Sequence, residues 1–250
     1  MKSDDYNPAE YADVAVVARE AGQNMLERLD YVALKPSRIL EVGSGVGFCA
    51  QLLRARYPDA VIVTLDLKEE MLKFAKQNKE TSKSICADAS QLPFLPHTFD
   101  LIVSNLLIPW LPDLKKLLYE WRRVLRPNGL FIFTSLGPDT LIELKENIDI
   151  RPQLLDMHNV GDELIQAGFV DPILDVEHIT LNYRQREQLL RELYITQMIS
   201  SSLNEKENFS LSITYEIIYG HTWAPSDSTE YTANNEGVVK IPLSHLQRKT

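Results

Sequence analysis

The sequence predicts an α/β fold built on a seven-stranded, mostly parallel sheet, with an N-terminal helix and a small helical cap. Short runs rich in Val, Ile and Leu alternate with helix-like segments between residues 36 and 136. This alternation is typical of parallel strands joined by right-handed helical crossovers. Two later strand-like segments follow without such alternation, and they predict an antiparallel edge. A length of 250 residues is sufficient for one domain of this kind, and we expect it to span residues 1–250.

The expected elements follow this pattern in order. Apolar residues recur at spacings of three and four from Val14 to Leu29, so residues 8–34 are predicted to form a helix, which Pro36 ends. The predicted strands lie at 39–42, 60–65, 84–87, 99–103 and 130–134, and the predicted helices at 47–57, 68–78 and 113–126. Residues 127–129, Pro-Asn-Gly, predict the turn before the last of these strands.

The pattern changes after Leu136. Residues 139–148 and 161–168 are predicted to be helices, and Gly168 ends the second. An amphipathic helix is expected at 184–200, between strands at 173–181 and 211–219. The polar segment 200–210 predicts a mobile loop, and the turn-rich tail after Trp223 predicts partial disorder.

Composition and charge narrow the possible functions. A hydrophobic fraction of 44% and a charged fraction of 24% are ordinary for a globular protein. The formal net charge of -9 disfavours nucleic acid as a partner, because phosphate binding needs a basic surface. The polar start and the lack of a long apolar run predict neither a signal peptide nor a membrane span. Cys49 and Cys86 have no metal-ligand spacing and give no disulfide framework, so we expect a cytoplasmic protein without a metal site.

The segment 41–47, Glu-Val-Gly-Ser-Gly-Val-Gly, places three glycines between a predicted strand and a predicted helix. Bare backbone at such a position lets a ligand approach closely. A dinucleotide fingerprint would have its third glycine where Phe48 stands. Glu41 would repel a pyrophosphate, whereas its charge suits the cationic amino-acid end of S-adenosylmethionine. The loop therefore favours S-adenosylmethionine as the ligand.

Polar residues follow each of the next three predicted strands. Asp66 ends the second strand, where an acid can accept hydrogen bonds from both hydroxyls of a ribose. Asp88 follows the third strand, where a carboxylate can accept from an adenine amine, and Asn105 follows the fourth. Either acid standing alone would equally suit a helix or turn cap. Because the carboxyl ends of parallel strands meet at one edge, we expect a single site there. The predicted cofactor-binding residues are Glu41, Gly43, Ser44, Gly45, Gly47, Asp66, Leu67, Asp88, Ala89, Asn105 and Leu106.

At these residues the sequence resembles the class I S-adenosylmethionine-dependent methyltransferases, which have a Rossmann-like sheet. The resemblance covers residues 36–136, the predicted cofactor-binding core. The segment 41–47 is similar to the family's first motif, Asp66 to its ribose-binding acid and Asp88 to its adenine-binding acid. The connecting segments 92–100 and 125–129 are similar to those of the family as well.

Three segments outside that core resemble a narrower group, the malonyl-acyl-carrier-protein O-methyltransferases of biotin synthesis. They are residues 136–144, residues 156–162 together with 167–172, and residues 213–223, and residues 241–243 are similar to that group's tail. Members usually carry a longer helical insert before the last strand, where this chain has only residues 200–210. The resemblance implies that residues 137–210 cover the substrate and that residues 211–250 form the final strand and the tail.

The resemblance implies methyl transfer from S-adenosylmethionine to the free carboxylate of a malonyl thioester. This carboxylate is ionised at neutral pH, so no general base is required. Alignment of the reacting atoms and exclusion of water would supply the catalysis, so we expect positioning residues instead of an acid/base pair. Each candidate also suits a structural or surface role. The candidates are Asn105 and Trp110 at the methyl end of the pocket, Tyr6 and Tyr11 to close over the cofactor, Arg151, Arg184 and Arg191 for the carboxylate, and His158 and His221 in family-like segments.

A cluster of cations predicts where an acidic acyl carrier protein would dock. The cations fall on or beside the predicted helix at 113–126, and opposite charge steers association. A solvated helix face is the alternative interpretation. The cations are Lys115, Lys116, Arg122, Arg123 and Arg126, and a second candidate surface consists of Arg184, Arg186 and Arg191.

Other functions remain open at this stage. The short segment before Ile213 leaves room for another small acid or acyl thioester as the substrate, including malonyl-coenzyme A. Residues 140–144 are partly shared with methyltransferase-like proteins that act in the assembly of a respiratory complex. A non-catalytic binding module is disfavoured, because buried carboxylates without a ligand would be costly.

Overall fold

The computed structural model describes residues 7–78, 83–144, 148–199 and 210–226. Tyr6, nearly all of the predicted loop 200–210 and residues 241–243 lie outside these ranges. The strands are β1 (Arg38–Val42), β2 (Val61–Asp66), β3 (Lys83–Cys86), β4 (Phe99–Ser104), β5 (Leu125–Leu136), β6 (Val170–Asn182) and β7 (Ser212–Trp223). The α-helices are α1 (Pro8–Val14), α2 (Val16–Glu27), α3 (Phe48–Arg56), α4 (Glu69–Gln77), α5 (Leu114–Val124), α6 (Met157–Gln166) and α7 (Arg186–Ile195). The short 3-10 helices are η1 (Arg28–Tyr31), η2 (Ile108–Trp110) and η3 (Ile142–Leu144).

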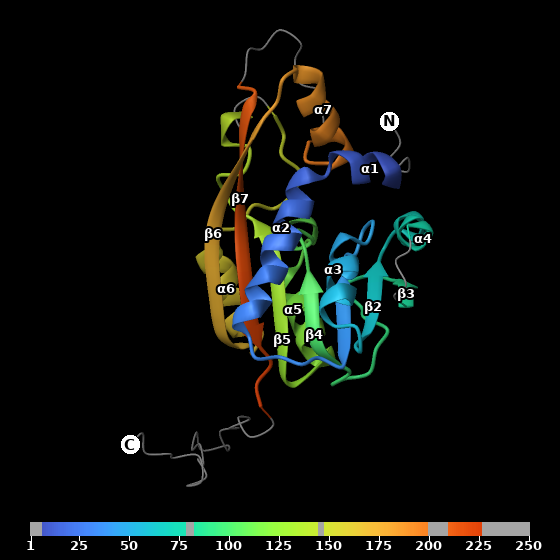
Figure 1. Cartoon of the computed structure of the whole chain (residues 1–250). Helices are drawn as coiled ribbons and strands as arrows, with labels where there is room; N and C mark the ends of the chain where they lie inside the picture. Colours follow the sequence, from blue (N-terminus) through green and yellow to red (C-terminus); the bar gives the residue numbers. More distant parts are fainter. Residues whose placement is uncertain (1–6, 79–82, 145–147, 200–209, 227–250) are drawn as a thin grey trace.

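The strands form one seven-stranded sheet in the order β3-β2-β1-β4-β5-β7-β6 (Figure 1). The pairs among β1 to β5 are parallel, and β7 is antiparallel to both β5 and β6. This topology confirms the predicted, mostly parallel sheet with an antiparallel edge. Every residue of β1 after Arg38 is buried, as expected for a central strand that is covered on both faces.

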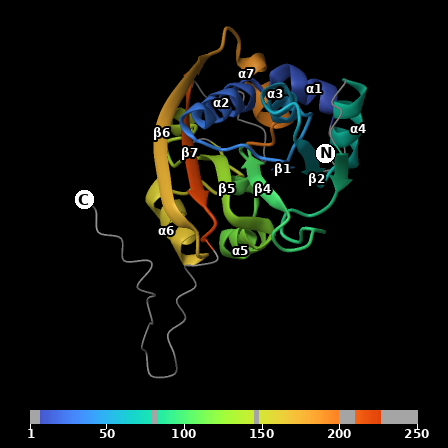
Figure 2. The same cartoon turned by 60° about the horizontal axis from the view of Figure 1, so that its bottom comes forward.

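Helices cover both faces of the sheet and divide the core into two layers (Figures 1 and 2). On one face, Ile39 of β1 belongs to a cluster with residues of α2, α3 and α7. On the other face, Leu40 belongs to a cluster with residues of α5 and α6. Adjacent residues of one strand thus enter opposite layers, which follows from the alternation of side chains along a strand. Within the described residues, no helix has both the length and the apolar character needed to cross a bilayer.

α5 shows how the sequence fixes a loop at the carboxyl edge of the sheet. Asp113 caps the helix by accepting a hydrogen bond of 2.9 Å from the Lys116 amide. The indole Nε1 of Trp121 donates to the carbonyl of Ala89 at 2.9 Å, which ties the loop after β3 to the helix. The buried residues recur at helical spacing: Leu114, Leu117, Leu118, Trp121 and Val124.

The prediction of one continuous helix over residues 8–34 is wrong, because the structure has two helices, α1 and α2, within this range. α1 and α2 are separate because Ala15, between them, has a non-helical ψ of 58°. Ala15 is only 2% exposed, so tertiary packing overrides the continuous apolar pattern here. The break lets α1 run across the carboxyl edge toward α7, where Asp13 and Arg191 form an ion pair of 2.9 Å (Figure 1).

Two other predicted helices are longer than those in the structure. The described residues 139–144 form a turn and η3, because Leu141 has a φ of 56°. α7 ends at Ile195, and Gln197 has a φ of 59°. A residue in the left-handed region cannot continue a right-handed helix. The chain after α7 therefore folds back, and Ile199 forms a bridge with Ile150.

The strands β5 and β7 extend beyond their predicted ends. β5 begins at Leu125, and its pairing with β4 shifts register between Phe99 and Leu101. The predicted turn at 127–129 lies at this irregularity, where Asn128 has a φ of 58°. β7 continues to Trp223. Its residues 217–223 pair with β5, and its pairing with β6 runs from Ser212 to Trp223.

Candidate active site

The glycine loop between β1 and α3 is held against the end of β2. The amides of Gly43 and Ser44 donate to the carbonyl of Leu65 at 2.8 and 3.0 Å. Gly43 and Gly45 have φ values of 73° and 51°, a region that favours glycine. A Cβ on Gly45 would meet no atom within 4 Å, so it would project into open space. The loop thus offers a ligand a cradle of bare backbone.

Asp66 connects this loop to the start of α4. Its Oδ2 accepts a hydrogen bond from the Gly45 amide at 2.8 Å, and its Oδ1 accepts one from the Lys68 amide at 2.9 Å. Burial raises the pKa of Asp66, while the amides of Lys68 and Gly45 oppose that rise. The contact with Lys68 is a local bond and not the helix cap that the sequence allowed, because Lys68 itself is the N-cap of α4 and that helix has no side-chain cap. The contact with Gly45 joins the predicted ribose acid to the loop.

A compartment of about 400 Å³ opens beside the glycine loop, at the carboxyl edge of the parallel strands. We call it the larger compartment, and its volume is within the range of small-molecule sites. It collects residues that follow four different strands, as the sequence predicted. The predicted cofactor-binding residues that line it are Gly43, Gly45, Asp66, Leu67, Asp88, Ala89, Asn105 and Leu106.

The other predicted cofactor-binding residues lie behind this lining. Glu41 and Ser44 are 3% and 6% exposed. Gly47 has a φ of 87° and stands at the start of α3. Asp88, by contrast, is exposed and accepts a hydrogen bond of 2.7 Å from the Ser90 amide. Direct cofactor contacts by Glu41, Ser44 and Gly47 stay predictions.

Asn105 is held firmly at the end of β4. Its Nδ2 donates to the carbonyl of Ala18 in α2 at 2.7 Å, and its Oδ1 accepts from the Thr134 hydroxyl in β5 at 2.7 Å. The next residue, Leu106, has a φ of 52°, which is strained for a bulky side chain. The Leu106 amide donates to the same Thr134 hydroxyl at 2.9 Å. Backbone strain that neighbouring bonds stabilise is typical of functional sites.

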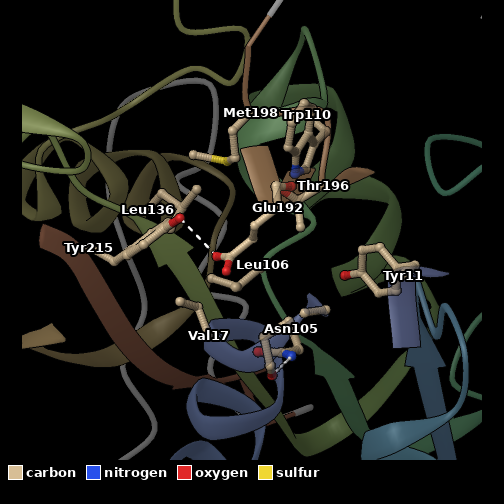
Figure 3. Close-up of a pocket in the computed structure, with 12 residues that line it drawn as sticks. Tyr11, Val17, Asn105, Leu106, Trp110, Leu136, Glu192, Thr196, Met198 and Tyr215 are labelled. Atoms are coloured by element: carbon tan, nitrogen blue, oxygen red, sulfur yellow. Dashed lines mark hydrogen bonds between the residues drawn. The ribbon is translucent and has the colours of Figure 1, made fainter. Parts of the chain in front are cut away.

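A second compartment, of about 80 Å³, adjoins the first (Figure 3). We call it the smaller compartment. α1, α2, α7 and β7 contribute to its lining. The two compartments meet at the residues that line both, so molecules held in the two would face each other there. These shared residues are Tyr11, Asn105, Leu106, Trp110 and Thr196.

Glu192 brings a carboxyl group into the smaller compartment (Figure 3). It is 6% exposed, and its Oε1 accepts a hydrogen bond of 3.0 Å from the Tyr215 hydroxyl. Burial raises the pKa of Glu192. This residue is not among those predicted, although an acid between the buried Leu189 and Leu193 of an amphipathic helix is a signal that would have found it.

Tyr11 and Trp110 both lie where the compartments meet. Their predicted roles, Trp110 at the methyl end and Tyr11 closing over the cofactor, stay predictions. Burial raises the pKa of Tyr11 to about 12, and the charge of Asp66 adds to this effect. The Tyr11 hydroxyl therefore stays protonated at neutral pH. It can act as a hydrogen-bond partner or as a wall of the site, but not as a base.

The three candidate arginines occupy different places. Arg151 is exposed and lines the larger compartment. Arg184 and Arg191 are exposed on the surface and are absent from the described lining of both compartments. Arg191 is also paired with Asp13. Only Arg151 among them is therefore placed to meet a ligand in this site.

The two candidate histidines are also absent from the described lining of both compartments. His158 is exposed at the start of α6, where its Nδ1 lies 2.7 Å from the Asp156 carboxylate. His221 lies in β7, and burial lowers its pKa. Their surroundings favour structural roles.

Glu216 of β7 organises the chain where it leaves β5. Its backbone carbonyl accepts from the Gly137 amide at 2.9 Å, and its carboxylate accepts from the Asp139 amide at 2.5 Å. A Cβ on Gly137 would overlap this carboxylate. Among the residues that the structure describes, Asp139, His178 and Glu216 bring potential metal-ligand atoms within 4.8 Å of one another. The expectation that the protein has no metal site stays a prediction.

The cations predicted on one helix face do not form one free basic surface. Arg123 pairs with Glu120 at 2.7 Å, and Arg126 pairs with Asp100 at 2.6 Å. Arg122 is half-buried beside Gly168. The spacing of the cations on and beside α5 does not reveal these neighbours, because Asp100 lies in β4 and Gly168 lies after α6. The exposed cations of the set are Lys115 and Lys116.

Comparisons with known proteins agree with this geometry. Residues 40–133 match a family described as a methyltransferase domain. A malonyl-[acyl-carrier protein] O-methyltransferase of Gallionella capsiferriformans is 34% identical over 94% of this chain and 91% of its own length. A second, from Coxiella burnetii, is 34% identical over 96% of this chain and 92% of its own length. The chain belongs to the malonyl-[acyl-carrier protein] O-methyltransferase family. This membership confirms the predicted methyltransferase activity and the predicted cofactor, S-adenosylmethionine.

Solved structures confirm the fold of this malonyl-[acyl-carrier protein] O-methyltransferase family member. The YcgJ protein of Bacillus subtilis has a TM-score of 0.63 and 16% identity, covering 83% of this chain and 99% of its own. Phosphoethanolamine N-methyltransferase 2 of Haemonchus contortus, solved with S-adenosylmethionine, has a TM-score of 0.56 and 20% identity. The match covers 83% of this chain and 53% of the Haemonchus contortus chain.

Several lining residues were not expected from the sequence. Those after α7 line the site only because the helix ends early, and the amphipathic pattern gave no sign of that end. Those on α4 and β7 belong to elements that were correctly predicted, but which of their side chains face a cavity depends on long-range packing. The unexpected residues are Lys68, Met71, Glu192, Thr196, Gln197, Met198 and Tyr215.

Proposed function

We propose that this chain transfers the methyl group of S-adenosylmethionine to the free carboxylate of a malonyl group on acyl carrier protein. Family membership supports this reaction. At the level of individual residues, the observation that supports this reaction is that the larger and smaller compartments meet at Asn105, Leu106 and Trp110. The methyl donor in one compartment and the acyl group in the other would face each other there. The product is a methyl ester, which belongs to biotin synthesis in the family that the sequence resembles.

S-Adenosylmethionine supplies an electrophilic methyl group when bound. In the proposal, Gly43 and Gly45 receive its amino-acid end, Asp66 accepts from its ribose hydroxyls and Asp88 accepts from its adenine amine. The open space over Gly45 fits such a group, because a side chain there would fill it. Asp66 keeps acceptor capacity beyond its two amide bonds, since each carboxylate oxygen has two lone pairs.

The substrate side needs charge complementarity and fixed geometry. A malonyl carboxylate is ionised at neutral pH, so no residue has to remove a proton. Arg151 is the proposed partner of this carboxylate, because a guanidinium can bind it through two parallel hydrogen bonds. Asn105, fixed by its bonds to α2 and β5, and Trp110 would hold the acyl group in line with the methyl group. Tyr11 would close the site from α1 and exclude water.

An acidic carrier protein would approach from the side of α5. Lys115 and Lys116 are the exposed cations there and form the revised docking surface of the proposal. The second surface predicted from the sequence is weaker, because Arg191 is engaged with Asp13.

The proposal also keeps the predicted division of the chain and the cytoplasmic location. The division has a cofactor-binding core at residues 36–136, a substrate region at 137–210 and the final strand with the tail at 211–250. Both cysteines are free in the structure, in keeping with a reducing compartment.

The decisive experiment measures transfer of labelled methyl from S-adenosylmethionine to malonyl-acyl carrier protein. Malonyl-coenzyme A and acetyl-acyl carrier protein serve as comparison substrates. The wild type should label the malonyl carrier and leave the acetyl carrier unlabelled, because acetate in thioester linkage has no free carboxylate. Arg151→Gln should raise KM for the malonyl carrier about tenfold or more, the scale for losing a charged hydrogen-bond partner. Arg38→Gln, at an exposed position at the start of β1, is the matched control and should behave as the wild type.

Other outcomes would change the proposal. Labelling of malonyl-coenzyme A alone would remove the carrier protein as the substrate. No transfer to either malonyl thioester, by protein that still binds S-adenosylmethionine, would favour another small acid or a role in respiratory-complex assembly. Equal KM values for Arg151→Gln and the wild type would remove Arg151 from the substrate site.

A further inference from the structure

The smaller compartment contains an ionisable group that the proposed methyl transfer does not use. Glu192 lies on the buried face of α7 and is 6% exposed, and Figure 3 shows its carboxyl group directed into the compartment. Its Oε1 accepts a hydrogen bond of 3.0 Å from the Tyr215 hydroxyl. A buried carboxylate is costly unless cations or several donors surround it. The surroundings of Glu192 therefore decide which form it takes.

Those surroundings favour the neutral acid. The described residues that line the smaller compartment include no lysine or arginine. The titratable groups that face Glu192 are Tyr215 of β7, Tyr183 just after β6 and, across the compartment, Tyr11 of α1. Burial raises the pKa of all three tyrosines, so they stay neutral at working pH. Burial also raises the pKa of Glu192, and the hydroxyls of Tyr183 and Tyr215 oppose this rise without cancelling it.

A neutral carboxyl group has a hydrogen-bonding capacity that an ionised one lacks. One oxygen of Glu192 accepts from Tyr215, and the protonated group has an O–H that can donate. The compartment volume of about 80 Å³ is several times what one water molecule needs, so part of an acyl group fits there. With the malonyl carboxylate directed toward the larger compartment, the next polar atom along the acyl group is the carbonyl oxygen of the thioester.

We infer that Glu192, as a neutral acid, is a positioning residue that donates a hydrogen bond to the thioester carbonyl oxygen of the acyl substrate. This inference rests on the proposed function and assigns the smaller compartment to the thioester end of the malonyl group. The bond fixes the distance from the carbonyl to the carboxylate that receives the methyl group. An ionised Glu192 would lose the donor and would repel the substrate carboxylate in the same site.

The test compares three forms of the full-length protein on the malonyl carrier. Glu192→Ala removes the donor, and it should raise KM about tenfold, the factor for a lost hydrogen bond of about 1.4 kcal/mol. Glu192→Gln keeps a donor in a side chain of similar shape but cannot ionise, so KM should stay within about threefold of the wild type. Glu187→Gln, on an exposed position of the same helix, is the control and should leave KM unchanged. Thermal unfolding of each variant confirms that it is folded.

The pH dependence of kcat/KM distinguishes hydrogen-bond donation by Glu192 from a role of its side chain in packing alone. For the wild type, kcat/KM should fall as pH rises through the raised pKa of Glu192, because the donor is lost and a negative charge appears. Glu192→Gln should remove that fall, whereas Glu187→Gln should keep it. A wild-type profile that matches the profile of Glu192→Gln would overturn the inference, since Glu192 would then act by shape alone.

A substrate analogue locates the contact. A carrier that bears an S-(2-carboxyethyl) group keeps the carboxylate but has a methylene in place of the thioester carbonyl. Glu192→Ala should cost about tenfold in kcat/KM on the malonyl carrier and little on this analogue. Equal losses on both substrates would overturn the contact with the carbonyl. If the wild type methylates no malonyl thioester, the proposed function fails and this inference with it. If the wild type is active and Glu192→Ala has an unchanged KM, this inference alone fails.

Discussion

The Oδ2 atom of Asp66 accepts a hydrogen bond of 2.8 Å from the backbone amide of Gly45. This bond joins the end of β2 to the loop after β1. Asp66 therefore has two separable tasks: it shapes the glycine loop, and in the proposal it also binds the ribose of the cofactor. A carboxylate that does both should be more sensitive to substitution than one that only contacts the ligand.

Replacement of Asp66 tests both tasks. Asp66→Ala should weaken binding of S-adenosylmethionine by about 1–3 kcal/mol, the scale for losing a hydrogen-bond partner in a charged site. Asp66→Asn keeps one acceptor for the Gly45 amide, so its loss should be smaller. Titration calorimetry measures both affinities. Wild-type affinity in Asp66→Ala would remove this residue from the cofactor site.

Charge reversal on α5 tests the docking surface. The double variant Lys115→Glu with Lys116→Glu should slow association with the malonyl carrier and flatten its dependence on salt, because opposite charge steers encounter. Stopped-flow association at several salt concentrations measures this effect. Lys73→Glu with Lys76→Glu, at two exposed sites on α4, is the control with the same change of net charge. An on-rate that is the same for the double variant and the wild type would mean that the carrier docks elsewhere.

The buried acid Glu192 predicts a pH dependence of stability. Because its folded-state pKa is raised, the folded protein retains a proton that the unfolded chain has lost over the interval between the two pKa values. Its contribution to stability therefore falls as pH rises through that interval. Glu192→Gln removes the cost of ionising this buried acid, so its stability advantage over the wild type should grow as pH rises from the ordinary pKa of glutamate through the raised pKa of Glu192. Urea unfolding measures this difference, and a difference that is constant with pH would contradict it.

Two glycines predict opposite responses to alanine. A Cβ on Gly220 of β7 would overlap the ring of Phe133, which is fully buried, so Gly220→Ala should destabilise the fold by about 1–3 kcal/mol or more. A Cβ on Gly161 of α6 would lie 3.6 Å from Leu174, an ordinary contact. Gly161→Ala should therefore stabilise the protein by about 0.5–1 kcal/mol through helix propensity. Free energies of unfolding in urea compare the two, and equal effects would contradict the packing argument.

The sheet could be predicted because its parallel strands, apart from the edge strand β3, are largely buried and appear as apolar runs. The grouping of Asp66, Asp88 and Asn105 at one edge could be predicted because each lies at the end of a parallel strand or just after it; their contacts with a cofactor stay predictions. The parts that the sequence did not reveal depend on partners far along the chain. The end of α7 depends on how the following residues pair with Ile150, and the Arg126–Asp100 ion pair joins two segments that the helix pattern treats separately.

The ion pair between Asp13 and Arg191 connects α1 to α7. Tyr11 of α1 lines both compartments, and Glu192 of α7 lines the smaller one. A ligand that contacts Tyr11 in one compartment therefore also acts on a wall of the other compartment. The two binding equilibria are therefore linked. Cofactor and acyl substrate should each raise the affinity of the protein for the other by the same factor, as thermodynamic reciprocity requires.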